Sequence, residues 1–141
     1  MADYFDPKFG AFVAIPFVKS NVDTASTNLD FTLASGVNSL ALMPYAGSIV
    51  GLAVKGNANV TAGTASFSVH KESTEYTQAS SLLATMTTAA GASNIAYGTV
   101  RPGVMTFAAG DGIGVSVSSA TNLAATTIDF DALLYVVFNP T

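Results

Sequence analysis

Strict alternation of apolar and polar side chains over residues 64–71 is the feature that most limits what this chain can fold into. Apolar residues occupy one parity and polar residues the other: Ala65, Phe67 and Val69 against Ser66, Ser68 and His70. A period of two with one apolar face predicts a half-buried β-strand. On this pattern we expect the polar parity, His70 included, to be exposed.

Similar short apolar runs recur along the chain and are separated by Gly, Pro and Asn, which break strands. They predict strands at residues 29–33, 39–43, 48–55, 94–100, 104–108, 113–118 and 126–138, and favour a strand over a short helix at 81–88. Residues 21–28, 56–63 and 119–125 are expected to be loops. The sequence therefore predicts an all-β fold, an antiparallel β-sandwich or jelly roll of about eight to ten strands, with a closed barrel as the alternative.

The last predicted strand is apolar on both of its faces in its second half. One parity holds Ile128, Phe130, Leu134, Val136 and Phe138, while the other changes from Asp129 and Asp131 to Leu133, Tyr135 and Val137. A strand of this kind is either covered on both sides within the fold or lies at a subunit interface.

Aromatic residues are concentrated in the first twenty positions, which we interpret as an N-terminal arm (1–20) preceding a β domain (21–141). Pro16 cannot donate to a sheet ladder, so an extended arm with one edge strand is favoured over a central strand. The arm either covers the open end of its own domain or docks on a neighbouring subunit. The candidate subunit or capsid interface comprises Tyr4, Phe5, Phe9, Phe12, Phe17, Leu133, Tyr135 and Val137.

The composition is apolar and weakly charged. Half of the residues are hydrophobic and 10% are charged, whereas soluble domains carry about a quarter charged residues. Such a surface is easily buried in an assembly, although an ordinary Ser- and Thr-rich β domain is the alternative. The five Lys and Arg residues are scattered and the net charge is −4, which argues against direct binding to nucleic acid.

The cysteine content and the apolar runs indicate the cellular compartment in which the chain is expected to be made. There is no Cys, so neither disulfides nor thiolate metal sites are expected, in keeping with synthesis in a reducing cytoplasm. The apolar run at residues 9–18 is interrupted by Pro16 and is too short to span a bilayer. We expect no membrane partner and no signal peptide.

No catalytic constellation stands out, and the chain is not expected to be an enzyme or to carry a cofactor. The single histidine, His70, would have to serve any Ser-His-Asp triad, and no Gly-x-Ser-x-Gly motif is present. Asp129 and Asp131 should share one strand face, and with Asp111 they could hold Ca²⁺ only if all three came together. No metal site is therefore assigned.

Three blocks of the sequence resemble small structural proteins of tailed bacteriophages. They are residues 43–51 (MPYAGSIVG), followed by 60–64 (VTAGT) and a strand ending His70-Lys71; residues 107–115 (FAAGDGIGV); and the terminal strand ending in 135–138 (YVVF). The resemblance covers residues 29–138. It is to head decoration (cement) and fibre-type proteins with a jelly-roll domain, and more distantly to the trimeric jelly rolls of the C1q and TNF type.

The resemblance implies a homotrimer that binds the major capsid protein on the outside of a phage head and stabilises the capsid. The protein would be made in the bacterial cytoplasm and reside on the virion exterior. Removing residues 2–20 should then leave the β domain folded. The alternative is a receptor- or carbohydrate-binding tip domain of a phage tail or head fibre, and a small hydrolase is a third reading.

Overall fold

The computed structural model describes residues 12–22, 25–36, 38–72, 74–75, 84–87, 93–124 and 128–139, which form twelve strands. These are β1 (Phe12–Val22), β2 (Ala25–Asp30), β3 (Thr32–Leu33), β4 (Ala41–Leu42), β5 (Gly47–Val60), β6 (Ala62–Lys71), β7 (Thr74–Glu75), β8 (Ala84–Thr87), β9 (Ser93–Thr99), β10 (Met105–Phe107), β11 (Gly112–Ala124) and β12 (Ile128–Phe138). Within these ranges no helix is long and apolar enough to cross a membrane.

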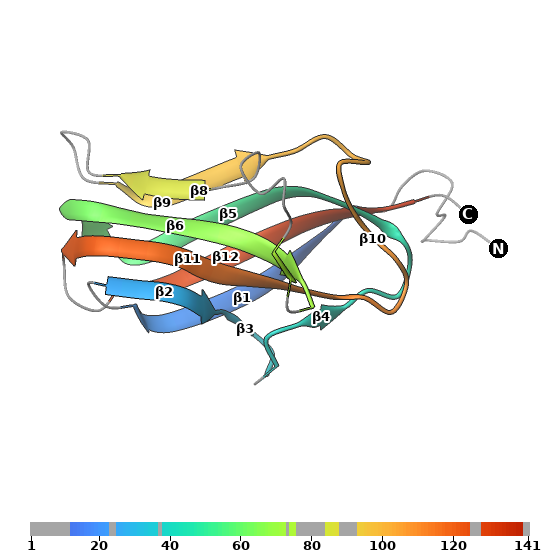
Figure 1. Ribbon diagram of the computed structural model, residues 1–141, viewed down its shortest axis with the longest axis horizontal. Helices are drawn as coiled ribbons and strands as arrows, with labels where there is room; N and C mark the ends of the chain where they lie inside the picture. The colour runs from blue at the N-terminus through green and yellow to red at the C-terminus, as the bar shows by residue number, and fades with distance from the viewer. Residues whose placement is uncertain are drawn as a thin grey trace.

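The strands form two antiparallel sheets packed face to face (Figure 1). In the first sheet the order is β3-β1-β12-β5, with β9 and β10 both pairing with β5. In the second sheet the order is β2-β11-β6-β7, with β4 pairing with β11 and β8 with β6. Each sheet thus has a main set of four neighbouring strands, β1-β12-β5-β9 in the first and β2-β11-β6-β8 in the second. This is the jelly-roll arrangement of two Greek keys, and it confirms the predicted fold class.

The core is the set of inward-facing side chains between the sheets, and the alternation in the sequence assigns it correctly. Phe67 of β6 is completely buried, and its ring meets that of Phe130 of β12 edge-on with centroids 5.0 Å apart. The Phe31 ring also packs edge-on against the Phe67 ring, with centroids 6.0 Å apart. These three aromatic rings join the two sheets at the centre of the sandwich.

Three strands extend further than the sequence suggests, at the end of β5, the start of β6 and the end of β11. Residues 56–63 and 119–125 are small and polar and were expected to be loops, but β5 runs to Val60, β6 starts at Ala62, and β11 runs to Ala124. The pairs Thr64–Thr121 and Ala62–Ala124 continue the ladder between β6 and β11. Backbone hydrogen bonding sustains these strand ends even where the side chains give no apolar face.

Residues 12–20, which the sequence assigns to an N-terminal arm, form most of strand β1 of the sandwich. Strand β1 pairs with β12 from Phe12 to Lys19, and Phe17 is completely buried. The carbonyl of Pro16 accepts a hydrogen bond from Ala34 N at 3.1 Å, so it points to the edge of β1 away from β12. The nitrogen of Pro16 points to the same edge. Pro16 is therefore tolerated, because the ladder with β12 loses no donor. Residues 1–11 lie outside the described residues.

Candidate interaction surface

The outer face of the first sheet carries a row of apolar side chains across four adjacent strands. The register places Tyr97 of β9 opposite Ala53 of β5, Ala53 opposite Leu133 of β12, and Leu133 opposite Pro16 of β1. Side chains in such cross-strand positions lie within contact distance of one another. Tyr97 is 76% exposed and Leu133 is 40% exposed, so the row is open to solvent along its length.

A second row lies one step along the same strands. Tyr135 of β12 is flanked by Gly51 of β5 and Ala14 of β1, and a Cβ on Gly51 would lie 3.5 Å from the Tyr135 ring. Because Gly51 and Ala14 are small, the Tyr135 ring can pack close to the backbone of the sheet. Phe12 stacks on it with centroids 5.5 Å apart and is itself 62% exposed. The aromatic pair therefore extends the apolar surface toward the start of β1.

A shallow groove of about 460 Å³ crosses the face beside these rows. Pro16, Ile95 and Leu133 line it, and its charged residues among those described are Lys55 and Asp131. These two are directly paired across β5 and β12, so their opposite charges offset each other. The groove is therefore apolar, and its charged lining residues carry no net charge.

The predicted interface residues divide between the two sides of the sheet. Phe12, Leu133, Tyr135 and Val137 share the outer face, whereas Phe17 points into the core. The remaining three, Tyr4, Phe5 and Phe9, lie outside the described residues.

Sequence reasoning missed two exposed members of the outer face, Ile95 and Tyr97 of β9. They share a parity within a short strand whose other parity includes the buried Ala96. The sequence shows apolar residues on both parities of this strand, so it does not indicate which parity faces the core.

His70 is buried, contrary to the expectation of an exposed side chain. It is 6% exposed and lies in a recess of about 340 Å³ lined also by Asp30, Ser39, Leu40 and Glu72. The imidazole packs directly over Gly114 of β11, where any side chain would occupy the same space. Its Nε2 is 3.9 Å from Asp30 Oδ1, which is too long for the hydrogen bond that orients a catalytic imidazole.

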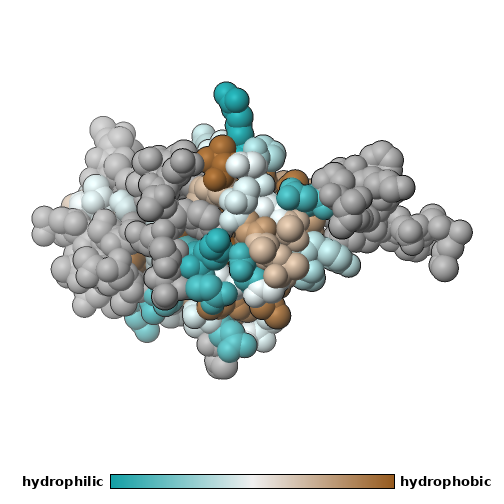
Figure 2. Space-filling model, turned by 45° about the vertical axis from the view of Figure 1, so that its right-hand side comes forward, coloured by the Kyte–Doolittle hydropathy of each residue, from teal (hydrophilic) through white to brown (hydrophobic). Residues whose placement is uncertain are grey.

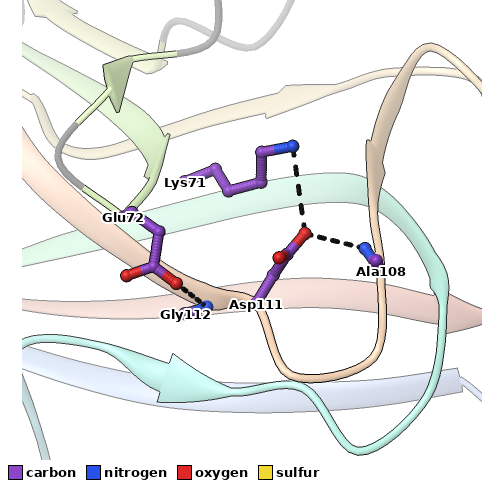
Figure 3. Close-up of polar contacts among 5 residues, drawn as sticks. All are labelled: Lys71, Glu72, Ala108, Asp111 and Gly112. Carbon is purple, nitrogen blue, oxygen red and sulfur yellow. Dashed lines mark hydrogen bonds and ion pairs between the residues drawn. The ribbon is translucent and has the colours of Figure 1, made fainter.

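The three aspartates considered for Ca²⁺ are not brought together. Asp111 accepts a hydrogen bond from Ala108 N at 2.8 Å and lies 3.8 Å from Lys71 Nζ, which fixes the turn before β11 (Figure 3). Asp129 lies beyond the far end of β11, where it accepts a bond from Asn21 N at 2.8 Å. Among the described side chains no group of three His, Asp or Glu could hold a metal ion.

Hydrophobic residues also reach the surface elsewhere. On the side drawn in Figure 2, separate hydrophobic patches lie between hydrophilic residues. Leu42 and Tyr45, near the β4 end of the sandwich, are 73% and 43% exposed. The outer face of the first sheet is thus accompanied by a second apolar surface.

No family model matches the chain, and no curated protein sequence matches it. Among solved structures it is similar to a chain of the capsid asymmetric unit of cyanophage Pam1, with 14% identity, a TM-score of 0.45, and coverage of 92% of this chain and 86% of that one. It is also similar to a chain of sacbrood virus of honeybee, with 15% identity, a TM-score of 0.36, and coverage of 94% and 73%. Both TM-scores are below 0.5, so the function has to be inferred from the chain's own surface.

Proposed function

We propose that this chain is a virion structural protein that associates with copies of itself through the outer face of its first sheet. More specifically, it decorates and stabilises a bacteriophage capsid as a homotrimer. The observation that carries the proposal is the uninterrupted apolar row from Tyr97 through Leu133 to Pro16, beside a groove whose charged lining residues, Lys55 and Asp131, have opposite charges. Apolar surface of this kind is stabilised when another protein removes it from water.

A second copy is the occupant that this face suits best. The charges at Lys55 and Asp131 offset each other within one subunit, so the groove that they line presents no net charge to a neighbouring copy. In a cyclic trimer this face of each subunit meets a different surface of the next subunit, and the same contact is repeated around the axis. On a capsid, many such trimers at equivalent sites would add their contacts through high effective concentration.

The alternative of a carbohydrate-binding tip domain is less well supported by the same face. Tyr97 is an exposed aromatic ring on which a sugar could stack. However, sugar recognition also needs several convergent hydrogen-bonding groups, and within the described lining of the groove the charged side chains are those of Lys55 and Asp131. An apolar face with few hydrogen-bonding groups favours a protein partner over a sugar.

The first test is the mass of the purified protein by sedimentation, with Leu133→Glu as the variant. Wild-type protein should sediment at three times the monomer mass of 14.3 kDa, and the variant should shift to monomer because a carboxylate would be buried in the apolar contact. Val104→Glu is the matched control, since Val104 is 45% exposed but lies on the turn before β10. It should remain trimeric.

A monomeric wild-type protein, or equal effects of the two substitutions, would overturn self-association through this face. The decoration role is tested separately by incubating the protein with mature capsids of its own phage and analysing purified virions. Absence from virions together with failure to bind capsids would exclude it, and selective binding to a glycan array would favour the tip domain.

A further inference from the structure

A second apolar groove opens between the two sheets, at the edge formed by β1 and β4. It has a volume of about 680 Å³ and is lined from the first sheet by Val13, Ile15 and Phe138, and from the second-sheet side by Leu42 and Tyr45, among others. Val13 and Ile15 face inward, on the same side of β1 as the fully buried Phe17, but remain only half-buried. The two-residue strand β4 is too short to cover them, so the sandwich is open here.

The groove runs beside an unpaired stretch of sheet edge. Strand β3 pairs with β1 only at Phe17 and Val18, and within the described chain no strand adjoins residues 12–16 on that side. Backbone groups two residues apart point to the same side of a strand. Since the Pro16 carbonyl points toward Ala34, the N–H and C=O of Ala14 also point to this open edge. Such an edge next to an apolar groove is suited to the addition of one more strand.

The sequence immediately before β1 has the chemistry that this groove would take. In an extended conformation Phe5, Pro7 and Phe9 share one face, while Asp6 and Lys8 share the other. One face of such a strand would fill an apolar groove and the opposite face would remain in water. Eleven residues precede Phe12, and a chain of that length reaches at most about 36 Å, enough to arrive at a neighbouring subunit.

The pairing register with β1 indicates whether the segment in the groove comes from the same chain or from another copy. Folding back on β1 through the commonest two-residue turn, at Gly10-Ala11, would place Lys8 and Asp6 opposite Val13 and Ile15, and hence turn charges into the groove. A three-residue turn would correct the parity but would place Phe9 in the turn. A strand from a second copy is free to choose a register in which both Phe5 and Phe9 enter the groove.

We infer that residues 4–9 of one copy add as a strand along the β1 edge of a second copy, with Phe5 and Phe9 in the groove between β1 and β4. The inference rests on the proposed self-association and names a second contact within it. A second contact would add to the area buried between subunits, which is about 800 Å² on each partner of a standard interface.

Single-cysteine variants test the exchange cleanly, because the chain has no natural Cys. Full-length chains carrying Phe5→Cys and Leu42→Cys are co-expressed and then oxidised. Leu42 is 73% exposed, so its replacement leaves the core intact. We expect a disulfide-linked species at twice the monomer mass on a denaturing gel. The control replaces Leu42→Cys with Val104→Cys, at a site that is 45% exposed and lies outside the groove, and should give no such band.

Each other result overturns the exchange. Equal bands with both partners would show random collision. No band from the mixture, together with an intramolecular disulfide in the Phe5→Cys/Leu42→Cys double variant, would place the chain's own segment in the groove. If neither disulfide forms while the wild-type protein is a trimer that Leu133→Glu dissociates, the exchange fails but the proposed function stands. If the wild-type protein is monomeric, both fail.

Discussion

At the scale of single residues, the contact between His70 and Gly114 shows how a buried polar group limits its neighbour. A Cβ at position 114 would lie 2.5 Å from His70 Nε2 and 2.8 Å from the carbonyl oxygen of Ser39. We expect Gly114→Ala to lower the free energy of unfolding by about 1–3 kcal/mol, the usual cost of overpacking, in urea denaturation.

A double variant separates the two causes of that loss. His70→Ala removes the imidazole but leaves the Ser39 carbonyl, which is backbone and cannot rotate away. The pair Gly114→Ala/His70→Ala should therefore recover only part of the loss relative to His70→Ala alone. Complete recovery would mean that the Ser39 segment moves freely, and no recovery would mean that the imidazole already shifts aside in the single variant.

Asp111 acts as a turn residue, and its amide analogue can tell hydrogen bonding from charge. Asp111→Ala removes the acceptor for Ala108 N and should cost about 1–2 kcal/mol of unfolding free energy. Asp111→Asn keeps an acceptor oxygen and should cost clearly less. Lys71→Met should cost under about 0.5 kcal/mol, because an ion pair this exposed is weak. A loss for Lys71→Met as large as that for Asp111→Ala would contradict this order.

At the scale of elements, alternation in the sequence predicts most strands and, except in strands such as β9, the face that points inward, because burial selects one parity. Ala65, Phe67 and Val69 are all fully buried, as their pattern requires. Strand ends are harder to predict, since backbone pairing carries β5 to Val60 and β11 to Ala124 without an apolar pattern.

The candidate surface was predictable only in part, for a related reason. Two-sided apolarity in β12 identifies Leu133 and Tyr135 as surface candidates, but the partners that complete the row come from β1 and β9, and only the register reveals them. Likewise His70 is buried by contacts with Gly114 and a recess containing Ser39, both distant in the sequence. Local sequence patterns show which face of a strand is apolar, whereas the tertiary structure determines which faces are buried.

Two deletions distinguish the segment before strand β1 from β1 itself. Deleting residues 2–11 should leave the fold intact by circular dichroism and weaken the trimer. Deleting residues 2–20 should unfold the chain, because it removes Phe17 from the core and leaves β12 paired on one side only, with β5. Loss of one buried Phe side chain alone costs about 3–5 kcal/mol. A folded product of the longer deletion would show that β1 is dispensable after all.

At the scale of the whole molecule, charge and apolar surface are distributed in a way that suits assembly. Only 10% of the residues are charged, and on the outer face of the first sheet Lys55 and Asp131 offset each other. The second apolar groove lies at the edge where β1 begins, so two separate surfaces are available to neighbouring copies. A closed ring can use a face and an edge at once.

The response of the trimer to temperature and salt should reveal which force holds it. Apolar burial weakens on cooling because its heat-capacity change is large and negative, while salt screens only charge pairs. We expect sedimentation of dilute protein to show more monomer at about 4 °C than at 25 °C, and no added monomer in about 1 M NaCl. Leu133→Ala should shift the dissociation to higher protein concentration at both temperatures. An interface built on ion pairs would give the opposite pattern, dissociating in salt and holding in the cold, and would move the contact away from the apolar row on β9, β5, β12 and β1.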